Sequence, residues 1–373
     1  MRFNRFGRVL LAMVLALAGV SARGATTNYA GLVYSGSPDA STKAGIFDIS
    51  VSANRHFTGH MTIGGRSVGF SSRFDATGAA DFVVKITVIE DCAICDPGVV
   101  TTETHKLWNV HFQLSPGGES LSGGIHFRQG GFPDGTISAK RSSFNGQNKF
   151  AGAGKFTFVF AGSGDAANTN FPTGNGFGTA SINSSGKVHA SGMLADRSTF
   201  SESTLLCDDG TFPVYAPFFN GKAMIQGWAG LTNGSALDVT GDVVWVKPDV
   251  AGRTFYPAGF TNDVPITGSR YAQSRPLLNW TNGVVIFQGG KLSSPFTNFV
   301  TLNSKGVVVN LSENQLALKI DSSTGRFSGT VTPPAARESI SFSGVLLQNV
   351  NGGFGFFPDA PLSGAVTLGP AGL

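Results

Sequence analysis

The fold is decided by a stretch near the start of the chain, residues 47–74, which reads FDISVSANRHFTGHMTIGGRSVGFSSRF. Apolar and polar side chains alternate through 47–51, 57–63 and 68–74. Alternation over four to eight residues is typical of a half-buried β-strand, and paired glycines such as Gly64-Gly65 suit a tight turn. The stretch therefore predicts three consecutive antiparallel strands.

The composition extends this expectation to the whole chain. Of 373 residues, 51 are glycine and 31 are phenylalanine, while only 13% are charged, against about 25% in an average soluble domain. Few strong helix formers are present, and turn-like segments recur at intervals of about 8–15 residues. We expect an all-β protein of antiparallel meanders forming two or more barrel-like or sandwich units, with almost no helix after residue 22.

An internal repeat is predicted. Residues 316–346 (LALKIDSSTGRFSGTVTPPAARESISFSGVL) follow the order of 47–74: an alternating strand, a polar turn, Phe-[Ser/Thr]-Gly, a second turn and a third strand. Weaker copies of the middle element occur at 121–123 and 190–192. Repeated three-strand meanders suit a closed or nearly closed antiparallel sheet, and the glycine suits a bulge or bend. The alternative is that a glycine-rich composition produces such matches by itself.

Composition divides the chain into three blocks. The first spans 26–141 and the second 150–248. Residues 249–278 are polar and glycine-rich and are predicted to be a connection. The third block spans 279–368, with the alternative that it shares a sheet with the second.

The N-terminus has the pattern of a secretory signal peptide. Three arginines within the first eight residues precede an apolar run at 9–20 (VLLAMVLALAGV), followed by small residues. A membrane-spanning helix needs about 20 apolar residues, so this run is too short. Residues 1–22 are predicted to be removed after Ala22, with cleavage after Gly24 as a second option and a retained anchor as the alternative. The protein is therefore expected outside the cytoplasm, in the periplasm, at the cell surface or in the medium.

The net charge argues against a nucleic-acid partner. Three of the four net positive charges lie in the signal segment, which leaves +1 for the remainder. No Lys/Arg cluster remains that could neutralise a row of phosphates. No second apolar stretch of 18 or more residues follows, so no transmembrane helix is expected after signal cleavage.

The cysteines are few. Cys92 and Cys95 are predicted to form a short disulfide at a hairpin tip, because an exported chain meets an oxidising environment. Reduced thiols and a zinc site with His105 and His111 are the alternatives. The third cysteine, Cys207, has no predicted partner.

The carboxylates do not define a catalytic site. Asp208 and Asp209 could contribute to a calcium site, but a solvated turn is favoured. A glycosidase needs two carboxyls about 5–9.5 Å apart, and Asp196, Glu202 and Asp208 are candidates that sequence cannot place. No Gly-x-Ser-x-Gly elbow in a strand–turn–helix context is present. We therefore predict no catalytic residue, no metal site and no cofactor.

Aromatic residues of the second half are the predicted ligand-facing group. Side chains with a flat ring and a polar handle often build binding surfaces. The alternative is that they pack the core or close a barrel end. The candidates are Trp228, Trp245, Tyr256, Tyr271 and Trp280.

Several segments resemble large exported bacterial β-repeat proteins of unassigned function. The likeness covers most of the chain after the signal segment. It is carried by 171–179 (FPTGNGFGT), 192–196 (GMLAD), 209–215 (DGTFPVY), 245–248 (WVKP), 256–260 (YPAGF) and 342–348 (FSGVLLQ). Arg197 and Phe212 depart from that group, where Gly or an aromatic and a tryptophan are common. The resemblance implies a β-rich fold and a surface location, and it implies no catalytic residue.

These observations favour an exported, non-catalytic structural or interaction protein of the bacterial cell surface or periplasm. A glycan or another surface protein is the expected partner. One alternative is an extracytoplasmic hydrolase acting on polysaccharide. The other is an outer-membrane β-barrel, which would need girdles of Trp and Tyr, whereas here phenylalanine greatly outnumbers both.

Overall fold

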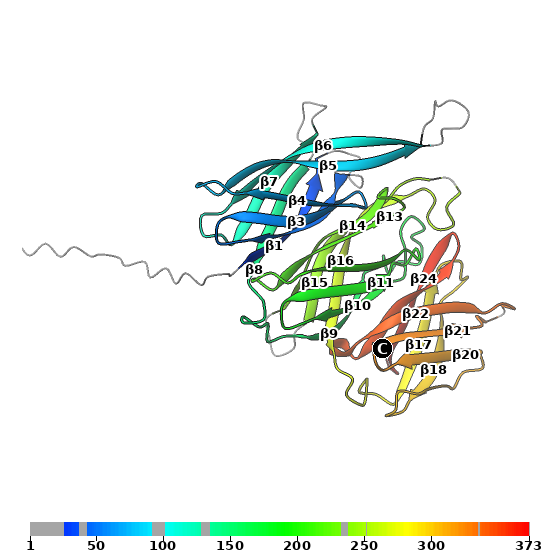
Figure 1. Cartoon of the computed structure of the whole chain (residues 1–373). Helices are drawn as coiled ribbons and strands as arrows, with labels where there is room; N and C mark the ends of the chain where they lie inside the picture. Colours follow the sequence, from blue (N-terminus) through cyan, green and yellow to red (C-terminus); the bar gives the residue numbers. More distant parts are fainter. Residues whose placement is uncertain are drawn as a thin grey trace, which may run out of the picture.

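Nearly all regular secondary structure in the described residues is β-strand (Figure 1). The structure is a computed structural model that describes residues 26–36, 43–91, 101–127, 135–232, 238–250, 252–334 and 336–372. These described residues form 24 strands and one short 3-10 turn, η1 (Gln348–Val350), and the strands assemble into three antiparallel sheets of eight. The predicted all-β fold of antiparallel, barrel-like units is confirmed.

The first sheet, here called the first barrel, has the strand order β4-β3-β2-β1-β8-β7-β6-β5. Because β4 and β5 are consecutive in the chain and β1 pairs with β8, the sheet curls until its two edges meet and is nearly closed. Its strands are β1 (Thr27–Ser35), β2 (Gly45–Val51), β3 (His56–Ile63), β4 (Arg66–Arg73), β5 (Ala79–Asp91), β6 (Thr101–Leu114), β7 (Ser120–Phe127) and β8 (Gly135–Ser142).

The second barrel repeats this topology, with the order β12-β11-β10-β9-β16-β15-β14-β13. Its first strand, β9, pairs with its last, β16, and its edges β12 and β13 meet at a seam. Its strands are β9 (Gly154–Phe160), β10 (Gly176–Ile182), β11 (Lys187–Met193), β12 (Thr199–Leu205), β13 (Thr211–Phe218), β14 (Ala223–Leu231), β15 (Asp238–Lys247) and β16 (Phe260–Tyr271).

The third barrel opens one strand earlier, with the order β19-β18-β17-β24-β23-β22-β21-β20. A single bridge, Val307 to Lys319, connects its edges β19 and β20. Its strands are β17 (Asn282–Gly289), β18 (Phe296–Leu302), β19 (Val308–Asn310), β20 (Leu316–Asp321), β21 (Arg326–Val331), β22 (Ile340–Leu347), β23 (Gly352–Asp359) and β24 (Leu362–Pro370).

Phenylalanine fills the barrel interiors. In the first barrel, Phe57 is fully buried, and its ring centroid lies 4.6–6.3 Å from those of Phe70, Phe74, Phe82 and Phe112. Strand alternation explains this arrangement, because β3 shows a strict exposed–buried pattern from its first residue. The other two barrels have separate apolar interiors of the same kind.

The glycine of the Phe-[Ser/Thr]-Gly element makes room for a phenylalanine ring. Gly59 lies opposite Phe70, and Gly329 lies opposite Phe342, in unbroken antiparallel registers. A Cβ at Gly329 would lie 2.6 Å from the Phe342 ring, and one at Gly59 would lie 3.0 Å from the Phe70 ring. The sequence predicted a bulge or bend here; the ladder instead continues, and a cross-strand ring covers the glycine.

The second barrel is longer than the predicted second block. The predicted connection, 249–278, contains β16, which pairs with both β15 and β9 and so completes this sheet. The third block forms a sheet of its own, which corrects the alternative of a shared sheet. The two segments of the predicted repeat, 47–74 and 316–346, both form three-strand meanders, β2–β4 and β20–β22.

Candidate functional site

The outer face of β14 joins the second barrel to the first. The side-chain amide of Gln226, only 6% exposed, donates hydrogen bonds to the carbonyl oxygens of Val33 (2.9 Å) and Gly45 (3.1 Å). Two residues along the strand, the indole N–H of Trp228 donates to the hydroxyl of Tyr34 at 2.7 Å. Strand alternation places both side chains on the same outer face. Trp228, a predicted ligand-facing residue, is therefore part of this joint.

Ion pairs surround the joint. Lys140 Nζ lies 2.7 Å from Asp209 Oδ2, and Arg141 Nε lies 2.7 Å from Asp208 Oδ2. Burial opposes ionisation of Asp208, but hydrogen bonds from Arg141 and Ser143 outweigh it and hold its pKa below the usual value. The two aspartates thus pair with the first barrel. They lie in an exposed turn, as predicted, and from it they reach across the joint to the two basic side chains.

A second, buried ion pair lies beyond the N-terminal end of β12, whereas Asp208 follows its C-terminal end. Lys247 ends β15, and Asp196 lies in the turn between β11 and β12. Their Nζ and Oδ2 atoms are 2.5 Å apart, and the two side chains are 3% and 1% exposed. The other oxygen of Asp196 accepts a hydrogen bond from the Ser198 backbone N–H at 2.9 Å. Because each charge is out of water, each depends on the other for compensation.

A basic recess of about 550 Å³ opens beside this ion pair. The Phe219 ring is 41% exposed there, and the Arg253 guanidinium lies 3.4 Å from its centroid. Arg197 is exposed at the same recess. Three cations and one carboxylate line it, so the recess carries net positive charge and favours an anionic ligand. We call this group of residues, Asp196, Arg197, Phe219, Lys247 and Arg253, the basic recess.

Segments far apart in the sequence converge next to the basic recess. Trp245 packs edge-on against Phe171 and Phe260, with ring centroids 5.7 and 4.9 Å apart. Tyr256 packs on Phe260, and its hydroxyl lies 3.0 Å from Ser363 Oγ in the third barrel. Three of the segments on which the family resemblance rests, 171–179, 245–248 and 256–260, therefore meet in one apolar cluster. Trp245 and Tyr256 are 3% and 4% exposed and serve packing.

The remaining predicted aromatics lie at the third barrel. Tyr271 is buried and its hydroxyl donates to the Ser322 carbonyl at 2.8 Å. Trp280 is half-buried, and its indole N–H donates to the Asn351 carbonyl at 3.1 Å. The structure thus distributes the five predicted residues over joints and interiors, and it does not gather them on one exposed face.

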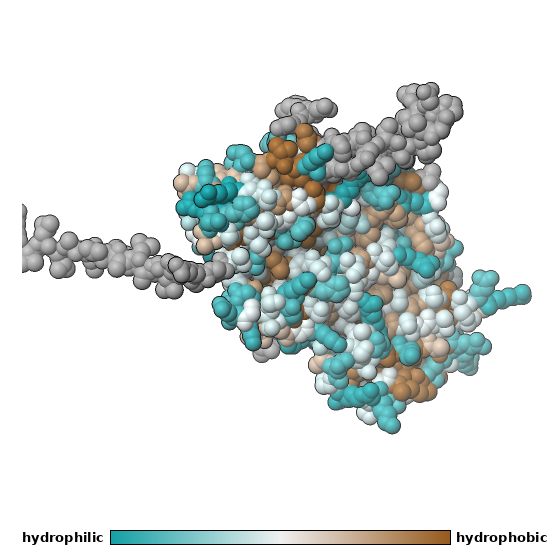
Figure 2. Space-filling model, viewed as in Figure 1, coloured by the Kyte–Doolittle hydropathy of each residue, from teal (hydrophilic) through white to brown (hydrophobic). Residues whose placement is uncertain are grey.

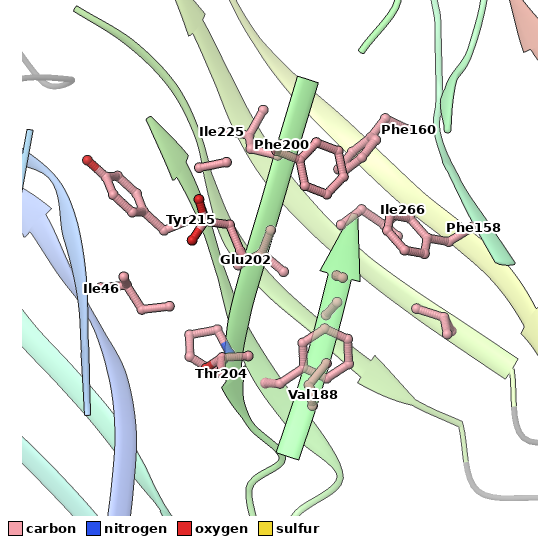
Figure 3. A pocket seen from close by; sticks show the side chains of 17 residues that line it. Ile46, Phe158, Phe160, Val188, Phe200, Glu202, Thr204, Tyr215, Ile225 and Ile266 are labelled. Atoms are coloured by element: carbon pink, nitrogen blue, oxygen red, sulfur yellow. The ribbon is translucent and has the colours of Figure 1, made fainter. Parts of the chain in front are cut away.

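The seam of the second barrel encloses a small apolar cavity (Figure 3). Phe200, Glu202 and Thr204 line it from β12, residues of β13 line the other side, and Ile46 of the first barrel contributes. Its volume of about 40 Å³ has room for only a few water molecules, whereas pockets for organic ligands measure about 300–1,000 Å³. Figure 3 shows the Glu202 carboxyl among the side chains of Tyr215, Ile225 and Phe200.

The apolar surroundings change the acidity of Glu202. Burial penalises the charged form and raises its pKa from 4.5 to about 7. Glu202 lies in the middle of β12, whereas Asp196 and Asp208 lie beyond its opposite ends. The three candidate carboxyls are not brought together, and the two aspartates are held in ion pairs. This arrangement does not supply the pair that glycoside hydrolysis needs.

Glu202→Gln is expected to stabilise the protein above pH 7. The pKa of Glu202 is higher in the fold than in the unfolded chain, so its destabilising effect is absent below pH 4.5 and grows as pH rises to 7. The free energy of unfolding should fall by about 1–2 kcal/mol across this range, because partial solvation reduces the full linkage value. Urea denaturation at pH 4 and pH 8 measures it.

The matched control is Glu338→Gln, at an exposed carboxyl of the third barrel. This variant should keep the pH dependence of the unmodified protein. Equal pH dependence in Glu202→Gln and the unmodified protein would contradict the assignment of the penalty to Glu202.

The predicted cysteine site lies outside the described residues. Nothing in the structure bears on Cys92 or Cys95. Cys207 is buried as a free thiol, and burial raises its pKa to about 12, so the reactive thiolate is strongly disfavoured. His111, proposed for the zinc alternative, lies with Nδ1 2.9 Å from Asp81 Oδ1. Within the described part of the chain, no three metal-ligating side chains cluster.

None of the helical structure in the described ranges is long and apolar enough to cross a membrane.

Comparisons with known proteins give matches among solved structures only. No protein-family model matches the chain, and no curated protein matches it. Among solved structures, the chain is similar to a double mutant of the vaccine antigen Transferrin Binding Protein B from Haemophilus parasuis Hp5. The alignment covers 92% of this chain and 75% of that chain, at 12% sequence identity and a TM-score of 0.20.

Proposed function

We propose that the protein is an exported, non-catalytic structural or interaction protein of the bacterial cell surface or periplasm. One observation carries this proposal: the polar and aromatic side chains described above connect neighbouring barrels. Gln226, Trp228 and Tyr256 span joints, and Asp208 and Asp209 pair across one. The basic, apolar N-terminal pattern of residues 1–22 supports export.

The basic recess is the proposed ligand site. Phe219 is 41% exposed and adds apolar surface next to the Arg253 guanidinium that stacks on its ring, and Arg197 and Arg253 offer bidentate donors for carboxylate groups. An acidic polysaccharide, which presents apolar sugar faces and carboxylates, matches both features. This ligand class refines the glycan partner expected from the sequence.

A glycan array of acidic and neutral polysaccharides, probed with the chain from residue 23 onward, tests the ligand. We expect selective retention on acidic glycans. Arg253→Ala should weaken binding about tenfold or more, because hydrogen bonds to charged groups contribute about 1.5–3 kcal/mol. Arg337→Ala, at an exposed arginine outside the recess, is the control and should bind normally.

Two results would contradict the proposal. Equal binding of Arg253→Ala and the unmodified chain would remove the recess as the ligand site. Release of new reducing ends from any polysaccharide on the array would contradict the non-catalytic role and favour the hydrolase alternative.

A further inference from the structure

The first joint uses defined strands of each barrel. Counted within each barrel, the first and second strands of the first barrel, β1 and β2, contribute Leu32 and Ile46 from their outer faces. The fifth, sixth and seventh strands of the second barrel contribute Tyr215, Met224 and Val246. Leu32 and Tyr215 are 0% and 1% exposed, so the centre of this contact is as fully buried as a barrel interior.

The second joint repeats the same geometry. The first and second strands of the second barrel, β9 and β10, contribute Val159 and Phe177. They pack on Val345 of β22 and Phe356 of β23, the sixth and seventh strands of the third barrel. The fifth strand, β21, also takes part, because Arg326 donates a hydrogen bond to Thr179 on β10 at 3.1 Å. Each barrel therefore places the outer face of its first two strands on the fifth to seventh strands of the next.

On the third barrel an exposed apolar row lies along β18 and β19, next to the first strand β17, whose outward-facing Val284 is 7% exposed; within the described chain no other barrel covers this row. Phe299 of β18, its second strand, is 57% exposed and lies opposite Val284 of β17. The backbone N–H of Leu311 donates to the Phe299 carbonyl at 2.8 Å, which places Leu311 beside it. Val307 and Val309 continue the row and are 52% and 50% exposed. Figure 2 shows hydrophobic surface on the lower part of the molecule, where the third barrel lies.

The complementary face is the outer side of β5–β7 in the first barrel. Val83 lies on β5, the fifth strand, and is 44% exposed between Asp81 and Lys85 on the same face. The described residues include eight exposed large hydrophobic side chains, and five of them lie on these two terminal faces: Val83, Phe299, Val307, Val309 and Leu311. A second copy of this chain presents there the same strand positions, the fifth to the seventh, that each internal joint uses, with Val83 as the exposed apolar side chain.

We propose that the outer face of β17–β19 in one copy binds the outer face of β5–β7 in a second copy, head to tail. This inference rests on the structural or interaction role proposed above and names the partner. Such an interface joins two different surfaces, so it leaves a free face at each end and extends with concentration. The assembly continues the joint geometry that already connects the three barrels.

Sedimentation velocity of the chain from residue 23 onward, over a wide concentration range, tests the proposal. We expect concentration-dependent dimers and longer species. Phe299→Ser and Val83→Lys should each weaken association at least about tenfold, as loss of an interface hot spot does. Val350→Lys changes a 54% exposed valine away from both faces and should associate normally. The melting temperature of each variant, followed by circular dichroism, should match that of the unmodified chain, because the three side chains are exposed.

Mixing the two weakened variants identifies the geometry. Phe299→Ser retains the β5–β7 face and Val83→Lys retains the β17–β19 face, so their mixture should form a one-to-one dimer that grows no further. A Val83→Lys variant that dimerises alone as well as the unmodified chain would show face-to-face pairing and overturn the proposal. A strictly monomeric unmodified chain would also overturn it. That result would leave glycan binding at the basic recess unaffected, because the glycan array tests it separately.

Discussion

Replacing Phe57 with alanine is expected to lower the free energy of unfolding by about 3–5 kcal/mol, the cost of removing a fully buried phenylalanine. The side chain is 0% exposed and contacts four other phenylalanine rings. Three of these rings come from β4, β5 and β6, and the fourth, Phe74, directly follows β4, so the sheet fixes their positions. The cavity can therefore collapse only partly, which places the cost in the upper part of the usual range. Urea denaturation followed by circular dichroism measures the loss.

The matched control is Phe299→Ala, which makes the same chemical change at a 57% exposed site. Its free energy of unfolding should stay within about 0.5 kcal/mol of the unmodified protein, measured at a concentration where the chain is monomeric. Equal losses in the two variants would contradict a first barrel whose interior is built from these rings. A small loss at Phe57 alone would do the same.

Lys247→Met should lower the free energy of unfolding by about 3–5 kcal/mol, because it leaves Asp196 buried without its counter-ion. Asp196 is 1% exposed, and its only other polar contact in the described structure is the Ser198 N–H. A carboxylate in such a place has lost both water and its partner.

A double variant separates the ion pair from simple packing. Asp196→Asn combined with Lys247→Met removes both charges, while the asparagine oxygen can still accept from Ser198. Most of the loss caused by Lys247→Met should then be recovered, because neither buried charge remains. A double variant as unstable as the single one would contradict the electrostatic explanation and would favour the loss of lysine packing on Phe219.

Local periodicity predicted the strands well where inward and outward residues differ clearly. In β3, Phe57, Met61 and Ile63 are buried and the alternating residues are exposed or half-exposed, as the sequence indicates. The tight turn predicted at Gly64-Gly65 is present, with φ of 55° and 76° at the two glycines. These features depend on neighbouring residues only, so the sequence contains them.

The prediction failed where the apolar alternation of a strand is interrupted. Strand β16 lies in residues 249–278, which the sequence predicts to be a connection because the stretch is polar and glycine-rich. Within the strand, Asp263 and Pro265 interrupt the apolar alternation. Its buried residues, Val264 and Ile266, still follow the strand period. The pairing of β16 with β9, more than one hundred residues earlier in the chain, closes the barrel and overrides the weak local signal.

The candidate site was predictable only in part. Asp196, Lys247 and Tyr256 stood out as members of separate segments, but no local pattern indicates that they meet. The raised pKa of Glu202 depends on apolar walls contributed by both edge strands and by Ile46 of another barrel. The five aromatics were identified by type, and type alone does not separate a binding face from a joint. Three-dimensional pairing decides both questions.

The central claim is that successive barrels of one chain are joined through the outer faces of their strands. Carbodiimide cross-linking of the monomer, mapped by mass spectrometry, tests this claim most directly. Lys140 Nζ and Asp209 Oδ2, from different barrels, are 2.7 Å apart, so we expect an amide cross-link between them. Lys291 and Asp359, 3.4 Å apart within the third barrel, provide the internal positive control. Formation of the Lys291–Asp359 cross-link without the Lys140–Asp209 cross-link would contradict the account.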